Sequence, residues 1–323
     1  MRSKAQQIID AFHNINGQLN SIVDQAKNEL QNSVEEANTI VEKIADLNKQ
    51  ILANYSVNGQ NNTLLDQRDA LINQLSDLID ITTVFHSNGT VSLYNSYQAI
   101  ADEGQAYTIE LNWQSEQDVV QASISLSGNE NTQVKSGKIK SLIDTVNNQT
   151  SQLTTQLDQL VAAFVQRVNQ VHRSNYSLDG TTGIDFFDSI GLTSSSIQLS
   201  KMVSDSLSNI AVSMNGQSGD GSGALDIANI KDANILGGNQ VTTASFYSSI
   251  LSQLGENSKS AQQNLNIQTD MVNMLENQRQ SIMGVSLEEE MVNMIKYQQA
   301  FGAASKIITS VDEMMQTIID MVG

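Results

Sequence analysis

The chain has 323 residues, contains no proline or cysteine, and carries 17 basic against 35 acidic side chains, so its formal net charge is −18 at pH 7. The absence of proline permits long uninterrupted helices, and the absence of cysteine excludes disulfides and thiolate metal sites. The acidic balance argues against a nucleic-acid partner, and no apolar run is long enough to insert in a membrane. The first residues lack the apolar stretch of a Sec-type signal peptide, which leaves export by another route open.

The first segment has the 3.5-residue apolar repeat of a helix packed in a coiled coil or bundle. Between Ile9 and Ile51, eleven of the thirteen positions spaced alternately by three and four are apolar, with Asn16 and Ser33 as the exceptions. A helix of this length is too long to be one wall of a compact globule. The repeat therefore predicts a rod or bundle.

A polar loop is predicted at residues 53–62, followed by a second amphipathic helix that Thr63 is suited to cap. In residues 80–135 the pattern changes to β-branched and aromatic residues with a period of two. The Asn88-Gly89 pair within this stretch favours a type I′ hairpin turn. We expect a small antiparallel β-rich region here, inserted between helices.

Helical spacing returns in residues 136–175, 245–285 and 286–323. With residues 1–79, the first two of these ranges are expected to form a helical rod domain. Residues 176–244 are rich in Ser, Gly and Asn, and we interpret them as an irregular outer region. The predicted fold class is α+β, mainly α: a long-helix bundle or coiled-coil rod with an inserted small antiparallel β domain and a C-terminal assembly helix.

The last predicted helix, residues 286–323, has an apolar face wider than a two-stranded seam requires. Such a face normally contacts more than one neighbour, because it would otherwise aggregate. We therefore expect this helix to drive assembly. The expected interface residues are Met291, Met294, Ile295, Tyr297, Phe301, Ala304, Ile307, Ile308, Val311, Met314, Met315, Ile318 and Met321.

Three consecutive glutamates, Glu288 to Glu290, open this helix and raise the question of an acid–base or metal site. Adjacent helical residues point about 100° apart, so three in a row cannot converge on one atom. Ser286 and Glu289 instead match a capping box, in which each side chain accepts a hydrogen bond from the other residue's backbone amide. We interpret the glutamates as a helix cap.

Other side chains give little support to enzymatic chemistry. The three histidines do not stand at metal-ligand spacing: His13, His86 and His172. Three aspartates close in sequence leave a glycan hydrolase open as an alternative: Asp179, Asp185 and Asp188. We expect no enzyme activity, no catalytic or cofactor-binding residue, no metal and no cofactor.

Three stretches carry a resemblance to a known family. Residues 284–323, GVSLEEEMVNMIKYQQAFGAASKIITSVDEMMQTIIDMVG, resemble the C-terminal segment shared by flagellar rod, hook and hook-associated proteins. The stretch LLDQRDALINQLSDL is more discriminating. Together with VNQVHRSNYSLDGTTGIDFF at residues 168–187, it resembles the hook-associated protein 1 family of the hook–filament junction. The signature residues are Leu64, Leu65, Asp66, Gln67, Arg68 and Asp69.

The resemblance implies a structural subunit of the bacterial flagellum that links hook to filament through helical packing. It implies secretion through the flagellar type III apparatus to an extracellular position, with an export chaperone beforehand. The implied partners are other copies of the chain in a ring, the hook protein and the second hook–filament junction protein. Members of the family begin with a further N-terminal helix, so we expect this chain, which opens on MRSKAQQIID, to lack that segment.

Two other interpretations stay open. The chain is either another flagellar rod or hook axial subunit, or a secreted adhesin-like binding module that uses the surface of residues 80–130 or 176–244.

Overall fold

The computed structural model of the chain divides into two units, Met1–Leu251 and Ser252–Gly323. It describes the backbone of residues 1–58, 61–116, 119–126, 129–238, 240–283 and 287–322. Side chains are described outside residues 56–60, 115–120, 127–131, 239, 282–289 and 310–323.

Helices dominate the structure, and the strands are short and antiparallel, so the predicted mainly α, α+β fold class is confirmed. The helices are α1 (Arg2–Asn58), α2 (Asn62–Leu78), α3 (Lys138–Asp144), the π-helical turn η1 (Thr145–Gln149), α4 (Thr150–Ser174), α5 (Lys201–Asp205), η2 (Leu207–Asn209), α6 (Ser222–Asn229), η3 (Ile230–Asp232), α7 (Thr243–Met283) and α8 (Leu287–Val322). The strands are β1 (Thr82–Phe85), β2 (Val91–Asn95), β3 (Gln98–Asp102), β4 (Gln105–Ala106), β5 (Ile109–Glu116), β6 (Val119–Leu126), β7 (Asn129–Thr132), β8 (Asn234–Leu236) and β9 (Val241–Thr242).

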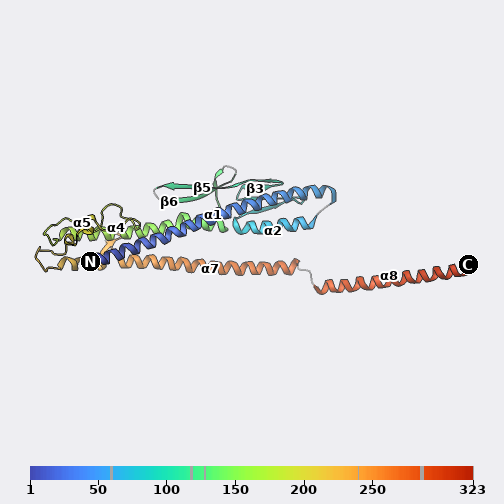
Figure 1. Cartoon of the computed structure of the whole chain (residues 1–323). Coiled ribbons are helices and arrows are strands. Elements are labelled where there is room, and N and C mark those ends of the chain that lie inside the picture. The colour runs from blue at the N-terminus through green and yellow to red at the C-terminus, as the bar shows by residue number, and fades with distance from the viewer. Residues whose placement is uncertain (59–60, 117–118, 127–128, 239, 284–286, 323) are drawn as a thin grey trace. The chain divides into compact units, whose positions relative to one another are not determined.

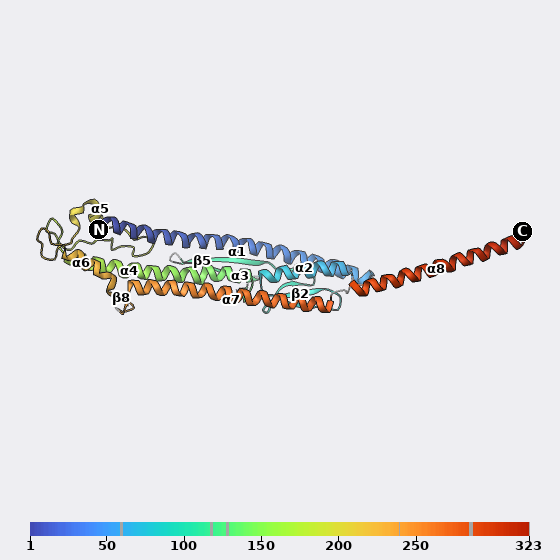
Figure 2. The same cartoon turned by 90° about the horizontal axis from the view of Figure 1, so that it is seen from below.

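Helix α1 is the spine of the first unit. Its 57 residues correspond to a length of about 85 Å. Helices α2, α3 and α4 follow one another along α1, as Figures 1 and 2 show from two directions. The π-helical turn η1 joins α3 to α4, so these three elements form one continuous helical segment.

The C-terminal half of α1 packs on α2 and on the two larger sheets, whose strand orders are β1-β2-β3-β4 and β5-β6-β7. The predicted hairpin is present, because β1 pairs with β2. Its predicted type I′ turn is wrong, since that type needs a positive φ at both Asn88 and Gly89, and of the two only Gly89 has one, at +84°. The core here is made of Leu30, Val34, Ala37, Ile40, Val41, Ile44, Leu75, Leu78, Ile79, Val91, Leu93, Ile100, Ala101, Ile109, Ala122, Ile124, Leu126, Val134 and Ile139.

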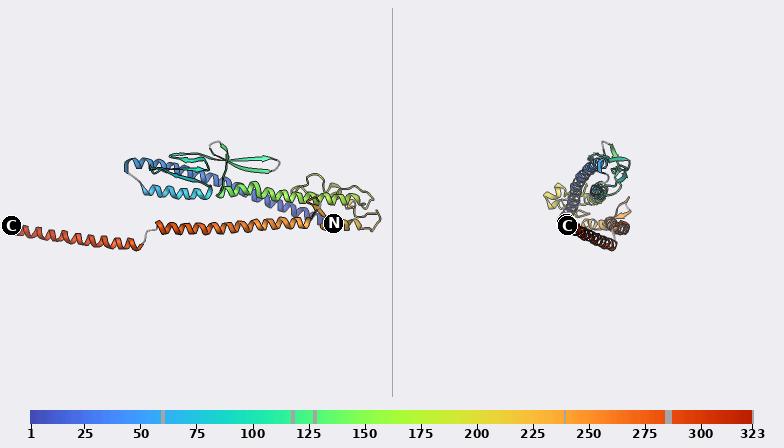
Figure 3. Two further views of the ribbon diagram at one scale, coloured as in Figure 1. Left: turned by 180° about the vertical axis from the view of Figure 1, so that it is seen from behind. Right: turned by 90° about the vertical axis from the view of Figure 1, so that its right-hand side faces the viewer.

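The N-terminal part of α1 packs on α4 and on the loops that follow it, which forms a second core. Figure 3 shows these loops gathered at the end of the first unit away from α2. The core residues are Ala5, Ile9, Val161, Val165, Val168, Ile184, Phe186, Phe187, Ile197, Val203 and Ile230. One helix therefore holds together two cores that lie at different positions along it.

Asparagine side chains dock the strands onto the helical spine. Asn48 of α1 donates from Nδ2 to the carbonyl of Val91 at 2.8 Å and accepts at Oδ1 from the amide of the same residue at 3.1 Å. Asn38 makes the same two bonds to Ile109 of β5, at 2.9 and 2.8 Å. Because an amide side chain has both a donor and an acceptor, it takes the place of a strand neighbour. Ile109 lacks one because β5 is an edge strand, and Val91 lacks one because the pairing of β3 with the internal strand β2 covers only Leu93 to Asn95.

The third such residue lies in the π-helical turn. Asn147 of η1 pairs with Ala122 of β6, donating at 2.8 Å and accepting at 2.7 Å. The Thr145 carbonyl accepts the i→i+5 bond of the π turn from the Thr150 amide, and the Thr150 hydroxyl donates to the same carbonyl at 2.8 Å. The π turn therefore stands where the helical segment meets the sheet.

The loop predicted at residues 53–62 is shorter than expected, because α1 continues to Asn58. The assignment of the cap to Thr63 is wrong. Asn61 is the N-cap of α2, and its side chain accepts from the amide of Leu64. Asparagine is at least as good a cap as threonine, and the position two residues earlier adds a half-turn to the helix.

The second unit consists of the rest of α7 and α8. Helix α7 begins in the first unit, where Ile250 is buried. The described side chains from Ser252 to Ser281 are exposed. The expectation that residues 245–285 belong to the rod bundle stays a prediction. No helix in the described part of the chain is long and apolar enough to cross a membrane.

Candidate assembly surface and loop clamps

Helix α8 exposes large apolar side chains along its described part. Tyr297 and Phe301 are each 76% exposed, and Ile307 is 65% exposed. The other predicted interface residues whose side chains are described are also exposed: Met291, Met294, Ile295, Ala304 and Ile308. Exposed apolar area on this scale is typical of surfaces that contact another molecule.

The rest of the predicted interface is described by its backbone alone. These residues lie within α8, and their side chains fall outside the described ones: Val311, Met314, Met315, Ile318 and Met321. The predicted helix cap also falls outside the described residues, since Ser286 is not described and Glu289 is described by its backbone only. Both assignments stay predictions.

The signature stretch in α2 contains a buried arginine with three kinds of partner. Arg68 is 3% exposed, and its Nη1 donates to the Gly89 carbonyl in the hairpin turn at 2.6 Å. Its Nη2 and Nε donate to Asp69 Oδ1 at 2.8 and 3.1 Å. Its guanidinium lies over the Phe85 ring, 5.6 Å from the centroid. Arg68 and Asp69 therefore fasten α2 to the β1–β2 hairpin, which is a structural role.

The other signature residues lie on α2 as well. Leu64 and Leu65 are half-buried, while Asp66 and Gln67 are exposed. Of the three charged side chains of LLDQRD, only that of Arg68 is buried inside the fold.

We expect Arg68→Ala to lower the free energy of unfolding by about 2 kcal/mol, because the variant loses a charged hydrogen bond and a cation–π contact. Urea denaturation of the whole chain measures this. Gln67→Ala is the matched control on the neighbouring exposed position, where we expect a change within about 0.5 kcal/mol. Equal effects in the two variants would contradict the fastening role of Arg68.

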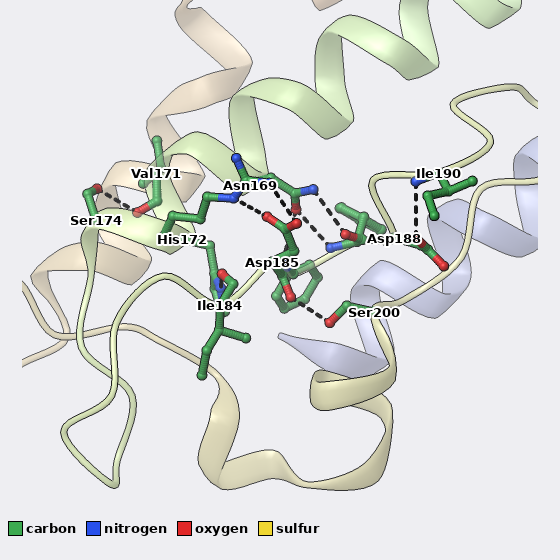
Figure 4. A network of polar contacts seen from close by, with 12 residues as sticks. Asn169, Val171, His172, Ser174, Ile184, Asp185, Asp188, Ile190 and Ser200 are labelled. Carbon is green, nitrogen blue, oxygen red and sulfur yellow. Dashed lines mark hydrogen bonds and ion pairs between the residues drawn. The ribbon is translucent and has the colours of Figure 1, made fainter.

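The stretch at residues 168–187 is a set of clamps between α4 and the loop that follows it (Figure 4). Asn169 donates to the Phe187 carbonyl at 2.9 Å and accepts from the amides of Phe186 and Phe187 at 3.0 and 2.9 Å. Arg173 forms a two-pronged ion pair with Asp185, in which Nη2 lies 2.7 Å from Oδ2. These bonds hold the two phenylalanines in the core, where their rings pack edge to face at 5.0 Å.

His172 is fully buried and joins two loop segments. Its Nδ1 lies 2.7 Å from the Ile184 carbonyl, and its Nε2 lies 2.8 Å from the Ala211 amide nitrogen. A carbonyl can only accept and an amide N–H can only donate, so the ring is neutral with its proton on Nδ1. A second proton on Nε2 would face the Ala211 N–H and break this clamp.

Burial lowers the pKa of His172 below its ordinary value, and the bond to Ile184 and the charge of Asp185 oppose this only in part. At about pH 7 and above, the ring is largely neutral in folded and unfolded chains alike, so the clamp contributes fully. As the pH falls through the ordinary histidine range, the unfolded chain takes up a proton that the folded chain does not. The folded state therefore loses stability towards acid.

When the pH is lowered from about 7 to about 5, we expect the free energy of unfolding to fall by up to about 2 kcal/mol because of this histidine. Urea denaturation at both pH values measures the loss. His172→Gln, which cannot titrate, should be less stable than the wild type at the higher pH and should lose less on acidification. If both proteins lost the same amount, the neutral clamp would be refuted.

Two of the three carboxylates considered for a hydrolase serve the loops instead, and the third, Asp179, is exposed. Asp185 is engaged by Arg173, and Asp188 accepts from the Ile190 amide and the Gln198 side chain, each at 3.0 Å. Within the described residues, no three His, Cys, Asp or Glu side chains are grouped so as to hold a metal ion. In the described part of the chain, Asp185 and Asp188 are thus bonded within the loops and give the hydrolase alternative no support.

Comparison with known families bears on the long first segment. Residues 1–187 match the family described as "Flagellar hook-associated protein FlgK helical domain". The chain belongs to the FlgK family. Residues 281–321 match a second family, "Flagellar basal body rod FlgEFG protein C-terminal". The first match extends from α1 to the Phe186-Phe187 pair, and the second covers nearly all of α8. The chain is therefore a structural component of the bacterial flagellum.

This chain is similar to proteins named flagellar hook-associated protein 1 from several bacteria. The Bacillus subtilis protein is 27% identical over 359 residues, covering 99% of this chain and 70% of the relative. The Salmonella typhimurium protein is 27% identical over 197 residues, covering 58% of this chain and 35% of the relative. The solved structure of the flagellar hook junction protein FlgK from Burkholderia pseudomallei has the same fold, with a TM-score of 0.51 and 23% identity. It is matched over 58% of this chain and 35% of its own length.

Sequence reasoning missed the clamp residues, which are neutral polar groups inside apolar helices. Asn48, Asn169 and His172 are all buried, and each bonds to backbone far away in sequence. The available signal was a break in periodicity. Asn16, one of the two exceptions in the first repeat, is buried and donates to the Ser194 hydroxyl at 3.0 Å.

Proposed function

We propose that the chain is a structural subunit of the junction between the flagellar hook and filament, and that α8 holds it there. The exposed apolar face of α8 carries the proposal, because the side chains of Tyr297 and Phe301 are largely exposed to solvent in the described structure. Membership of the FlgK family supports the location, since relatives carry the name hook-associated protein 1. The predicted interface on α8 is thus proposed as the contact surface with neighbouring subunits.

Burial of such a face gives a large driving force for assembly. Each large apolar side chain moved out of water stabilises the assembly by roughly 1.5–3 kcal/mol. Association costs several kcal/mol in lost translational and rotational freedom, so several such residues must act together to offset it. The length of α8, 36 residues, lets these residues meet more than one neighbour.

The partners follow from this placement. We propose other copies of the chain in a ring, with the hook protein on one side and the second hook–filament junction protein on the other. Before assembly, an export chaperone would cover the apolar face, because an uncovered face of this size aggregates. Export through the flagellar type III route to the extracellular part of the flagellum completes the proposal.

Deleting the gene in the organism that encodes this chain tests the placement. Electron microscopy should show hooks of normal number that carry no filament, with filament subunits released to the medium. Restoring the gene should restore filaments. Loss of the hooks as well would indicate a rod or hook subunit instead, and normal filaments would refute a flagellar junction role.

A further inference from the structure

Four Asn-Gly pairs occur in the chain: Asn16-Gly17, Asn58-Gly59, Asn88-Gly89 and Asn215-Gly216. This dipeptide is prone to spontaneous deamidation, because glycine has no side chain to hinder the reaction. The glycine backbone nitrogen attacks the side-chain carbon of the asparagine, and the backbone has to rotate for the two atoms to meet. The surrounding structure therefore decides which pair reacts. Gly59 falls outside the described residues, so three pairs can be compared.

Two of the three pairs are locked by backbone hydrogen bonds. Asn16 is buried in α1, where the Gly17 amide belongs to the hydrogen-bonded helix. In the β1–β2 hairpin, the Gly89 amide donates to the His86 carbonyl at 3.0 Å, and the Gly89 carbonyl accepts from the buried Arg68 at 2.6 Å. Rotation of the backbone at either pair therefore requires local unfolding.

The Asn215-Gly216 pair lies in an exposed loop whose amides are held by side chains. The Gly216 amide donates to the Ser213 hydroxyl at 2.9 Å. The amides of Met214 and Asn215 both donate to Oδ2 of Asp220, at 2.9 and 3.3 Å. A bond to a side chain breaks when that side chain rotates. The Gly216 nitrogen is therefore released without unfolding of the surrounding backbone.

The Asn215 side chain is folded back towards the nitrogen that has to attack it. Its Oδ1 accepts from the Gln217 amide two positions on, at 2.8 Å, which is the bond of an Asx turn. The Gln217 N–H thus points at the oxygen on which negative charge develops during the attack. Asn88 makes the same kind of bond to the Thr90 amide at 3.0 Å, so the two sites differ in how the backbone is held and not in the side chain.

We propose that Asn215 is a site of spontaneous deamidation in the folded protein, and that the fold protects Asn16 and Asn88. The Gly216 nitrogen forms a bond to Cγ of Asn215, the Cγ–Nδ2 bond breaks, and the amide proton leaves with Nδ2 as ammonia. Water then opens the succinimide at either carbonyl, which gives an aspartate or an isoaspartate at position 215. This modification goes beyond the proposed place in the flagellum and does not depend on it.

The product carries a new negative charge beside an existing one. The Ser213 hydroxyl lies 3.3 Å from Oδ1 of Asn215 and 3.0 Å from Oδ2 of Asp220, so the two side chains meet at one atom. Hydrogen bonds from the side chain and amide of Ser222 lower the pKa of Asp220, which keeps this carboxyl charged at neutral pH. Like charges this close repel each other, so the reaction opens the loop.

Peptide mapping by mass spectrometry tests the proposal, because trypsin places Asn16, Asn88 and Asn215 on different peptides. The whole chain is kept in mildly alkaline buffer, once folded and once unfolded in guanidinium chloride. Samples taken over several weeks give the rate of deamidation at each asparagine. The unfolded chain supplies the intrinsic rate of every pair, so each site is its own control.

We expect folding to slow the reaction at Asn16 and Asn88 by at least about tenfold, and at Asn215 by less than about threefold. Asn215→Gln should abolish the signal on its peptide, since the longer side chain closes the ring far more slowly. The proposal is overturned if folding protects Asn215 as strongly as Asn88. A signal that persists in Asn215→Gln would assign the reaction to another asparagine of that peptide and would overturn it as well.

Discussion

Replacing Phe301 and Ile308 together with aspartate should abolish swimming in cells that depend on this protein. Both side chains are exposed on one apolar line of α8, at 76% and 64%, and the proposed assembly buries them. Each substitution forfeits roughly 1.5–3 kcal/mol of apolar burial and adds a charge that is costly to desolvate. Swimming on soft agar and filament counts by electron microscopy measure the loss.

The matched control places the same two charges on the other side of the helix. Gln299 and Ala303 are exposed, and helical spacing puts them away from the line of Phe301 and Ile308. The Gln299→Asp, Ala303→Asp variant should swim normally. Normal swimming of the Phe301→Asp, Ile308→Asp cells would show that this face is not the assembly surface, provided that both variants are exported equally.

Asn48→Ala should lower the free energy of unfolding by about 4 kcal/mol, because the Val91 amide and carbonyl would both be left buried and unpaired. Asn48 and Val91 are fully buried, so water cannot readily replace the two lost bonds. The effect should exceed that of removing an ordinary surface side chain several-fold. Urea denaturation followed by circular dichroism measures it.

Asn14 provides the control for this substitution. It lies on the same helix but is exposed, and its only recorded side-chain bond accepts from Gln18 one turn away. Asn14→Ala should change the unfolding free energy by less than about 0.5 kcal/mol. Comparable losses in the two variants would mean that helix propensity, and not docking of β2, sets the cost.

The helical framework could be predicted from the sequence because its signal is local and repeated. The apolar repeat from Ile9 to Ile51 covers most of α1, and the Asn88-Gly89 pair located the β1–β2 turn. The helix ends were less predictable. The chain between α1 and α2 is polar throughout, and Asn61 and Thr63 are both acceptable caps, so only the packed structure distinguishes them.

The clamps could not be predicted, because their partners are backbone groups distant in sequence. Nothing near Asn48 indicates that it bonds to Val91, 43 positions away. His172 was considered only as a metal ligand, but it is buried between the Ile184 and Ala211 backbones and bonds to both. Arg68 stood out only as one of the signature residues, and its hydrogen bond to the Gly89 carbonyl, 21 positions away, has no sign in the sequence.

The assembly role of α8 stays a prediction that one measurement addresses directly. A photo-crosslinking analogue of phenylalanine at position 301 can be incorporated into the protein in flagellated cells, followed by irradiation of purified hook–filament structures. We expect crosslinks from this position to other copies of the chain, to the hook protein or to the second junction protein. If the protein were present in those structures and position 301 crosslinked to none of them, α8 would not be the assembly helix.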